Sequence, residues 1–192
     1  MKLNLGCGKD IRKGYVNVDL HNDVGVDKQC DLSKFPWPWP DGSAEEIMML
    51  DFLEHFPYRD TDKFIVECWR VLKPYGKLVI QVPDAEHLGK VLQCSKDNPY
   101  MCNKCGNLCW NYDCNRCGQT YEQIAEAAVA RMFGGQDYVG NWHYTSFNKP
   151  LLQHKLEKNG FDKVEFEELN ENGETYYQNW NIKAVAEKKD LW

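Results

Sequence analysis

The amino-acid sequence predicts an α/β protein built on a mostly parallel sheet. Strand-like apolar runs alternate with a helix-patterned segment in the first half of the chain. The run Lys77–Val82 reads Lys-Leu-Val-Ile-Gln-Val and is almost continuously apolar, which is typical of a strand buried on both faces of a parallel sheet. With 192 residues, of which 43% are hydrophobic and 27% charged, the chain is long enough for one domain with a full-sized core.

The first strands lie on either side of a glycine turn. Lys2–Leu5 is an apolar alternation that stops at Gly6-Cys7-Gly8, and Tyr15–Leu20 resumes it. The short connection between Gly8 and Asp19 leaves room for a helix of one or two turns at most. A proline- and tryptophan-rich loop follows, and the next strand is expected at Glu46–Leu50.

Helical periodicity defines the remaining framework. Apolar residues recur at helical spacing over Thr61–Leu72, and Pro74-Tyr75-Gly76 ends that run. The stretch from about Asp84 to Gly118 breaks the pattern and is interpreted as an insertion. Beyond it we expect two helices and two closing strands, over Tyr121–Phe133, Lys149–Lys158, Val164–Glu168 and Asn181–Glu187.

Charge and hydropathy restrict the environment and the partners. Lys and Arg total 23 against 29 Asp and Glu, a net charge of -6, which disfavours nucleic acid and anionic membrane as partners. The apolar stretches are far shorter than the roughly 20 residues that span a bilayer, and no signal-peptide pattern precedes the first strand. We therefore expect a cytoplasmic protein that contacts no membrane.

The cysteines predict a metal module inside the single domain 1–192. Two copies of Cys-x-x-Cys-Gly, at Cys102, Cys105, Cys114 and Cys117, have the spacing of zinc knuckles, and together they provide four thiolates for a closed, structural zinc site. Disulfides are the alternative, which a reducing compartment disfavours. Cys94 and Cys109 are possible extra ligands. We place this inserted module at residues 94–118 and expect zinc to be needed for its folding.

The glycine turn has the chemistry of a nucleoside site. Gly6 and Gly8 let the backbone approach a ligand closely, and Asp19 ends the next strand, where a carboxylate can accept both hydroxyl hydrogens of a ribose. A dinucleotide fingerprint requires a third glycine where Ile11 stands, and a helix long enough to receive a pyrophosphate is missing. The pattern disfavours NAD and favours S-adenosylmethionine, a nucleoside cofactor without phosphates.

A series of short motifs in order carries a resemblance to a known family. The series consists of Leu5-Gly6-Cys7-Gly8, Gly14 to Asp19, Asp31-Leu32, Pro40 to Ser43, Leu53-Glu54-His55, Arg70 to Gly76 and Val82-Pro83-Asp84. In order and spacing it resembles small class I S-adenosylmethionine-dependent methyltransferases, of the methyltransferase domain 11 type. The resemblance implies a Rossmann-like, mostly parallel sheet with helices on both faces. Two features depart from the family: we expect the fold to be shortened at the N-terminus, and the four-cysteine zinc insertion follows the strand that ends at Val82.

The resemblance also implies the cofactor contacts. Leu5, Gly6 and Gly8 would approach the methionine part, Asp19 would hold the ribose, and the carbonyl region of Leu50 and Asp51 would face the amine. Asp31 and Leu32 would contact the adenine. Each residue also has a structural alternative: the glycines could only form a tight turn, Asp31 could cap a short helix, and Asp19 could be a solvated strand end.

Methyl transfer from a sulfonium is an in-line displacement, so the protein supplies alignment and, for a protonated acceptor, a base. The candidates for the catalytic role are His55, Asp84 and His143, because His55 and Asp84 follow strands and His143 lies in a polar aromatic loop. His55 has the most suitable intrinsic pKa. Its alternative is a histidine hydrogen-bonded at the start of the next helix.

The sequence leaves two functions open. The first is an S-adenosylmethionine-dependent methyltransferase whose zinc insert shapes access for an unidentified acceptor, a small molecule or glycan in preference to a macromolecule. The second is a non-catalytic methyltransferase-like scaffold whose zinc module binds a protein or nucleic-acid partner. The sequence does not identify the acceptor.

Overall fold

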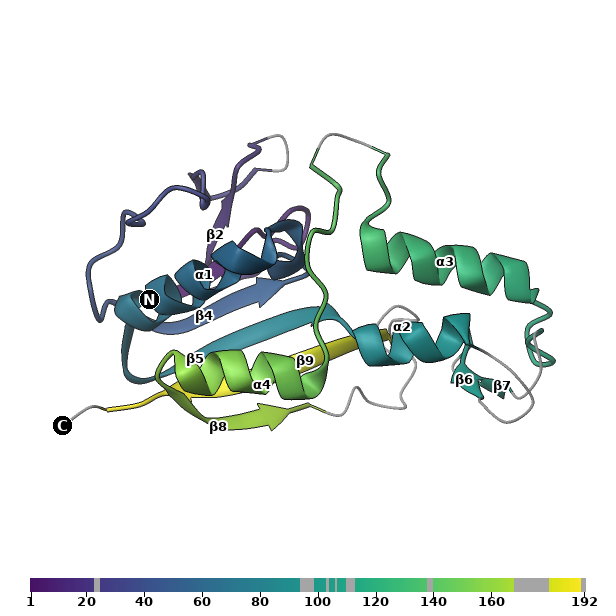
Figure 1. Ribbon diagram of the computed structural model, residues 1–192. Coiled ribbons are helices and arrows are strands. Elements are labelled where there is room, and N and C mark those ends of the chain that lie inside the picture. Colours follow the sequence, from purple (N-terminus) through teal and green to yellow (C-terminus); the bar gives the residue numbers. More distant parts are fainter. Residues whose placement is uncertain are drawn as a thin grey trace.

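The computed structural model describes residues 1–22, 25–93, 99–102, 104–105, 107–109, 113–137, 140–167 and 180–190. They contain a seven-stranded sheet in the order β3-β2-β1-β4-β5-β9-β8 (Figure 1). Its strands are β1 (Lys2–Leu5), β2 (Val16–Asp19), β3 (Lys28–Gln29), β4 (Ala44–Leu50), β5 (Leu72–Pro83), β8 (Phe161–Phe166) and β9 (Asn181–Lys188). The Rossmann-like fold class predicted from the sequence is confirmed.

The directions of the strands determine at which edge of the sheet a ligand is expected. Strands β3, β2, β1, β4 and β5 are all parallel, and β9 pairs antiparallel with both β5 and β8, so β9 alone runs in the opposite direction within this sheet. The chain order reverses between β1 and β4, because β1 pairs with both β2 and β4. Ligands in open α/β sheets bind at the carboxyl ends of the strands at such a switch point.

Two helices cover one face of the sheet. Helices α1 (Tyr58–Val71) and α4 (Lys149–Lys158) lie side by side in Figure 1, and the indole N–H of Trp69 on α1 donates to the carbonyl of Gly160 just beyond α4, at 3.2 Å. Their apolar residues form one core with the sheet residues Leu3, Ile47 and Ile80. The sequence leads one to expect helices on both faces, whereas the helices packed on the sheet within the described chain share this face.

The other two helices stand beyond the carboxyl end of β5 (Figure 1). Helix α2 (Ala85–Leu92) packs on α3 (Tyr121–Phe133), and both join a second apolar cluster that includes Cys102, Cys109 and Cys114. The small strands β6 (Tyr100–Met101) and β7 (Leu108–Cys109) pair in this region. The separate cluster gives the cysteine segment a small core of its own.

The predicted element bounds agree with the structure in part. Helices α3 and α4 begin and end at the expected residues, whereas α1, β5 and β8 each begin three to five residues earlier than predicted. Gly160, just beyond α4, adopts the left-handed conformation, with φ 90°. No helix forms between Gly6 and Tyr15. Helix α2 was not predicted, because it lies in the stretch interpreted as an insertion. A short 3-10 helix, η1 (Leu53–His55), follows β4.

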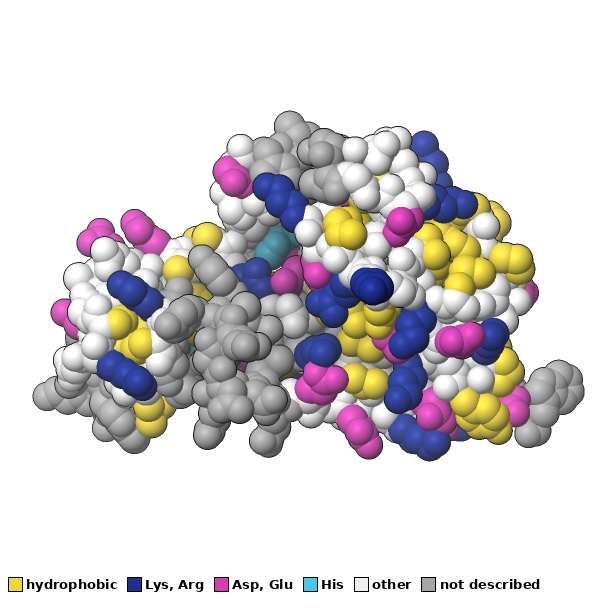
Figure 2. All heavy atoms as spheres, turned by 180° about the vertical axis from the view of Figure 1, so that it is seen from behind, with side chains coloured by type: hydrophobic (Ala, Val, Ile, Leu, Met, Phe, Trp, Pro, Cys, Tyr) yellow, Lys and Arg dark blue, Asp and Glu magenta, His cyan; other side chains and the backbone are white. Residues whose placement is uncertain are grey.

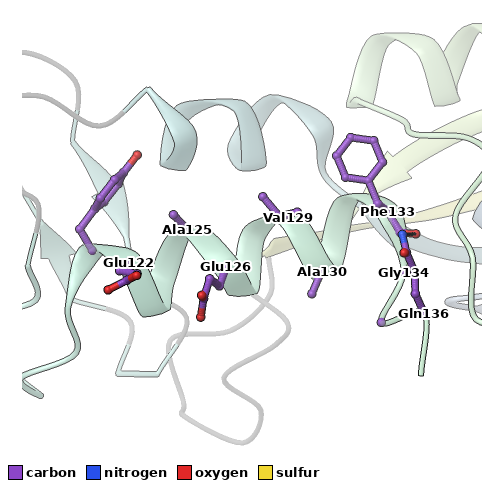
Figure 3. A pocket seen from close by; sticks show the side chains of 10 residues that line it. Glu122, Ala125, Glu126, Val129, Ala130, Phe133, Gly134 and Gln136 are labelled. Atoms are coloured by element: carbon purple, nitrogen blue, oxygen red, sulfur yellow. Dashed lines mark hydrogen bonds between the residues drawn. The ribbon is translucent and has the colours of Figure 1, made fainter.

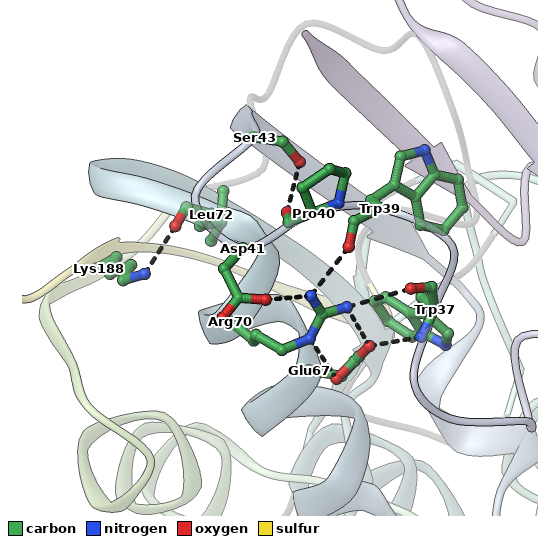
Figure 4. Close-up of polar contacts among 9 residues, drawn as sticks. All are labelled: Trp37, Trp39, Pro40, Asp41, Ser43, Glu67, Arg70, Leu72 and Lys188. Atoms are coloured by element: carbon green, nitrogen blue, oxygen red, sulfur yellow. Dashed lines mark hydrogen bonds and ion pairs between the residues drawn. The ribbon is translucent and has the colours of Figure 1, made fainter.

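A half-buried arginine fixes the proline-rich loop to α1 (Figure 4). The guanidinium of Arg70 pairs with Glu67 at 2.6 Å, and with Asp41 at 2.5 Å, and it donates to the carbonyls of Trp37 and Trp39. These contacts raise the pKa of Arg70, first through its hydrogen bond to Glu67. Trp37 and Trp39 are 2% and 7% exposed, so they are core residues rather than walls of an acceptor pocket.

The reverse face of the molecule carries mixed charges. Figure 2 shows basic, acidic and apolar side chains interspersed there. Among the ion pairs of the sheet strands are Lys2–Glu46 at 3.0 Å and Lys183–Glu167 at 2.6 Å. In the described residues, no helix is long and apolar enough to cross a membrane.

Candidate cofactor and acceptor site

The glycine turn after β1 adopts a backbone conformation that suits glycine. Gly6 and Gly8 have φ values of 65° and 51°, in the left-handed region. A Cβ on Gly6 would lie 2.0 Å from the ring of Phe52, whereas a Cβ on Gly8 would meet nothing within 4 Å. Gly6 is therefore required for packing, and Gly8 leaves open space above the turn.

Asp19 at the end of β2 holds this turn in place. One carboxylate oxygen accepts from the backbone N–H of Gly8 at 2.9 Å, and the other accepts from the N–H of His21 at 3.0 Å. An ionised carboxylate offers about four lone-pair sites, so these two bonds leave acceptor capacity for a ligand. Cys7, between the two glycines, is buried, and burial followed by the charge of Asp19 raises the pKa of its thiol to about 11.

A cavity of about 900 Å³ opens beside the turn and brings together most of the predicted cofactor residues. Gly6, Gly8, Asp19, Asp31, Leu32 and Asp51 all line it, together with Phe52 and His55. Asp31 accepts from the backbone N–H and the hydroxyl of Ser33, and the hydroxyl bond is the main cause that lowers its pKa. The volume is in the range of cofactor sites.

A second cavity of about 640 Å³ shares Gly6, Gly8 and Asp51 with the first. Leu50 lines this part, and Arg131 from α3 and Asn181 from β9 close it. Because the two cavities share wall residues, they are two compartments of one depression over the carboxyl ends of β1 and β4.

Asp51 is the centre of a polar network that links the two compartments. Its carboxylate accepts from Arg131 at 2.8 Å, from Asn181 at 3.1 Å and from Gln81 at 3.2 Å. Sequence reasoning missed Arg131, Asn181 and Gln81. Arg131 is a polar position on a predicted helix and Asn181 begins a predicted strand, and neither pattern indicates that they would meet Asp51.

Asn4 on β1 supports the turn from below. Its amide donates to the carbonyl of Asp10 at 2.7 Å and to the side-chain oxygen of Asn17 at 3.1 Å. Asn4 is 1% exposed. The side chain thus ties the loop after Gly8 to β2. Leu5 is fully buried in the core and lines neither compartment, so only its backbone adjoins the turn.

Two of the three predicted catalytic residues come together. His55, at the end of η1, and His143 have ring centroids 4.8 Å apart and meet edge to face. Backbone hydrogen bonds hold the two segments against each other: the N–H groups of Tyr144 and Thr145 donate to the carbonyl of Glu54 at 2.8 and 3.3 Å. His55 lines the larger compartment, so the histidine pair adjoins the cofactor site.

The environment lowers the pKa of both histidines. Burial lowers the pKa of His55, and burial followed by the proximity of His55 lowers the pKa of His143 to about 4. The Nδ1 of His55 lies 3.1 Å from the carbonyl of Trp142, and that of His143 lies 2.8 Å from the carbonyl of Arg131. The backbone of Gly140 and of Asp51 also hydrogen-bonds the His55 ring. Since a carbonyl only accepts, a neutral ring bonded through Nδ1 in this way has its proton on Nδ1 and its lone pair on Nε2.

Asp84, the third predicted catalytic residue, stands apart. Its carboxylate accepts from the N–H of Glu86 at 3.0 Å and caps the N-terminus of α2. Its backbone N–H donates to the carbonyl of Trp180 at 2.8 Å. Asp84 lines neither compartment of the cofactor depression.

The four knuckle cysteines converge. One sulfur of each lies within 4.8 Å of the others, with Cys102 to Cys117 at 3.7 Å and Cys105 to Cys114 at 3.4 Å. Four sulfurs at 2.3 Å from one zinc ion are separated by about 3.8 Å, so the arrangement fits a tetrahedral four-thiolate site. Burial raises the pKa of Cys114, but hydrogen bonds from the backbone N–H groups of Cys117 and Arg116 help to lower it to about 6.

Of the other two candidate ligands, Cys109 does not belong to this group of four. Cys109 is buried, and its thiol donates to the carbonyl of Asn107 at 3.5 Å. Cys94 lies outside the described residues.

A third hollow of about 680 Å³ lies along α3 (Figure 3). Its wall combines apolar side chains, among them Val129 and Phe133, with the carboxylates of Glu122 and Glu126. Val129 and Phe133 are 44% and 51% exposed. This hollow contains none of the predicted cofactor, catalytic or metal residues.

Comparisons with known proteins agree with the site. Residues 7–80 match the methyltransferase domain family. This segment includes Cys7 and Gly8 of the glycine turn, Asp19, Asp31 and the strand-end residues Asp51 to His55. No curated protein matches the chain significantly.

Solved methyltransferases share the fold over nearly the whole chain. A S-adenosylmethionine-dependent methyltransferase from Archaeoglobus fulgidus is 14% identical with a TM-score of 0.57, covering 97% of this chain and 85% of its own. One described as putative, from Listeria monocytogenes, is 13% identical with a TM-score of 0.59, covering 98% and 91%.

A third structure contains ligands. It is the 1,6-didemethyltoxoflavin-N1-methyltransferase of Burkholderia thailandensis, with bound 1,6-didemethyltoxoflavin and S-adenosylhomocysteine. It is 14% identical with a TM-score of 0.54, covering 98% of this chain and 71% of its own.

The fold and the family match define the class of the protein. It has the class I methyltransferase fold, and residues 7–80 match the methyltransferase domain family. The methyltransferase prediction made from the sequence is confirmed at this level of domain and fold.

Proposed function

We propose that the protein is an S-adenosylmethionine-dependent methyltransferase that acts on a small-molecule acceptor. The observation that carries the proposal is the shared depression at the switch point of the sheet, where the glycine turn, Asp19, Asp31 and Asp51 line one wall. The two compartments suit the two ends of the cofactor. The neighbour from Burkholderia thailandensis, whose structure contains a small molecule together with S-adenosylhomocysteine, supports the acceptor class.

The adenosine would occupy the larger compartment. Asp19 would accept the ribose hydroxyls with the lone pairs that Gly8 and His21 leave free. Asp31 and Leu32 would contact the adenine from the loop after β3, since both line this compartment. The open space above Gly8 would let the ligand lie close to the backbone.

The methionine end would occupy the smaller compartment. Its carboxylate would face Arg131 and its ammonium would face Asp51, because these groups supply complementary charges 2.8 Å apart in the wall of that compartment. The sulfonium would then lie near the boundary between the compartments, toward His55. We assign the acceptor side to His55 and His143, and we give Asp84 the structural role of a helix cap.

We further propose that Cys102, Cys105, Cys114 and Cys117 hold a structural zinc ion. Their sulfur spacing fits the ion, and a four-thiolate shell leaves no position open for substrate. The module, proposed at residues 94–118, adjoins α2 and α3, and α3 carries Arg131 into the cofactor site. The zinc module would thereby position α3 and shape access for the acceptor.

Calorimetry with S-adenosylmethionine tests the assignment of the cofactor site. The wild-type protein is expected to bind, and Asp19→Asn is expected to weaken binding roughly 10- to 100-fold, because a hydrogen bond to a charged acceptor contributes about 1.5–3 kcal/mol. The matched control is Asp162→Asn on β8, which lines neither compartment. Equal affinities for the two variants would remove Asp19 from the site.

The alternative is a non-catalytic scaffold that binds a macromolecular partner through the zinc module. The exposed apolar side chains of Val129 and Phe133 on α3 favour it. Formation of S-adenosylhomocysteine with any of a panel of hydroxyl, amine and phenol acceptors would decide for the enzyme.

A further inference from the structure

The strongest unexplained feature of the molecule is Glu54. Its side chain is 0% exposed, and neither carboxylate oxygen has a hydrogen-bond partner in the described chain. Burying an unpaired carboxylate is costly, so such a group is normally hydrogen-bonded, paired or bound to a metal. Burial and the nearby charge of Asp51 raise the pKa of Glu54 to about 8, which reflects the same missing partner.

The positive charge nearest in the network is already engaged. The guanidinium of Arg131 pairs with Asp51 at 2.8 Å and donates to Asn181 at 2.7 Å. Among the described residues, Glu54 therefore has no cationic side chain of its own as a partner. A bound cation would satisfy it.

Two histidines complete a ligand set around this carboxylate. One ligand atom each from Glu54, His55 and His143 lies within 4.8 Å of the others. Ligand atoms about 2.1 Å from one metal are separated by about 3 to 3.5 Å, so small side-chain rotations suffice to close the set. Two imidazoles and one carboxylate are a donor set that divalent transition metals favour.

The histidines are already oriented as metal ligands. Each Nδ1 donates to a backbone carbonyl, that of Trp142 for His55 and that of Arg131 for His143. In a neutral ring this contact places the proton on Nδ1 and the lone pair on Nε2, which is the usual outer-shell arrangement of a metal-bound histidine. Both histidines are only partly buried, so a bound ion would keep coordination positions open toward the cavity.

We propose that Glu54, His55 and His143 bind a divalent transition metal ion at the edge of the cofactor depression, and that the ion coordinates a hydroxyl group of the acceptor. The second part rests on the proposed methyltransferase function. The acceptor is thus a small hydroxyl-bearing molecule and the product is a methyl ether.

The chemistry explains why a hydroxyl acceptor gains most from the ion. A neutral amine already has a free lone pair, whereas a hydroxyl must lose its proton, and coordination to a metal lowers its pKa. The proton leaves to water, the oxygen forms a bond to the methyl carbon, and the carbon–sulfur bond breaks with its electron pair on sulfur. The leaving group is S-adenosylhomocysteine.

Metal binding is tested with Mn²⁺ and Co²⁺ on the zinc-loaded, full-length protein. Electron paramagnetic resonance follows the loss of free Mn²⁺, and visible absorption follows Co²⁺ in a nitrogen and oxygen environment. Wild-type protein is expected to bind one equivalent of at least one probe. Glu54→Gln, of nearly the same shape, and His143→Gln are each expected to weaken that binding at least about 10-fold, the lower end for loss of a ligand or its partner.

Controls separate the metal site from general folding effects. His154→Gln alters an exposed histidine on α4 and is expected to bind the probes as wild type does. The metal should raise the Tm of wild-type protein and of His154→Gln, but not of Glu54→Gln. Glu54→Gln without metal should melt no lower than wild type, because the change removes an unpaired buried carboxylate. Absence of binding of both probes, or equal binding by wild type and Glu54→Gln, would overturn the site.

The same samples distinguish this inference from the cofactor proposal. Calorimetry of S-adenosylmethionine is repeated on each variant, since Glu54 lines neither compartment. Metal binding without cofactor binding would remove the methyltransferase proposal and keep the ion. Cofactor binding without metal binding would remove the metal-site proposal and keep the methyltransferase proposal. Turnover of amines but not of hydroxyl acceptors by the metal-loaded enzyme would overturn the assigned acceptor class.

Discussion

Substitution of the two glycines of the turn should separate packing from ligand access. In Gly6→Ala the new Cβ would lie 2.0 Å from the Cδ2 of Phe52, and the ring cannot retreat freely because it packs against Phe56 and Phe64. The left-handed φ of 65° costs about 1–2 kcal/mol and overpacking about 1–3 kcal/mol, so we expect a loss of about 3 kcal/mol in the free energy of unfolding. In a chain of this size this lowers the Tm by roughly 6–12 °C.

Gly8→Ala is the matched control. Its φ of 51° carries a similar backbone cost, but its Cβ would meet nothing within 4 Å. We expect a loss of about 1 kcal/mol in stability and, because the methyl group would enter the cofactor cavity, at least about tenfold weaker binding of S-adenosylmethionine, about 1.4 kcal/mol.

Urea unfolding and calorimetry provide the two measurements. A second substitution, Phe52→Ala, removes the ring that the new Cβ would meet. In a double-mutant cycle it should therefore recover part of the stability lost in Gly6→Ala. Equal destabilisation by Gly6→Ala and Gly8→Ala, with no coupling to Phe52, would refute the packing argument.

Two further predictions concern stability and metal content. Asp62 accepts from Lys155 at 2.8 Å and from Lys158 at 3.0 Å; burial opposes the effect, but these bonds lower its pKa below the ordinary 3.8. These contacts therefore stabilise the fold above about pH 4, and Asp62→Asn should lower the free energy of unfolding by about 1 kcal/mol at pH 7. The difference in stability between wild type and Asp62→Asn should shrink as the pH falls through the lowered pKa. If urea unfolding gives a constant difference down to pH 2, the assignment is wrong. Removal of zinc with a chelator, or the substitution Cys102→Ser, should reduce the zinc content measured by elemental analysis by one ion per chain. Trypsin should then cleave faster at Arg116. An insert that stays protected from trypsin after zinc loss would disprove the structural role.

Features with a short sequence span could be predicted from the sequence. Two residues separate the knuckle cysteines within each pair, so a tight local turn brings each pair together, whereas the contacts between the two pairs span 9 and 15 residues. The apolar periodicity of α3 and α4 likewise gave their bounds, because burial of one face imposes the helical period. Helix α2 escaped prediction because it lies in a polar, cysteine-rich stretch of weak overall pattern.

The site depends on contacts of much longer range. Arg131 and Asn181 reach Asp51 across 80 and 130 residues of chain, and His143 meets His55 across 88. No local period relates such positions. They meet because β4, β5 and β9 are neighbours in the sheet, and because the backbone of residues 143–145 bonds to Glu54.

The sequence by itself determined the order of the longer strands and of helices α1, α3 and α4, the glycine turn with its acid and the spacing of the cysteines, since each of these is set by the period of burial or by the geometry of one turn. Tertiary structure alone decided that Glu54 would be buried without a partner beside two histidines, and that Asp84 would cap a helix instead of joining them. Burial and mutual distance are properties of the packed chain, and they are what turns a set of polar residues into a site.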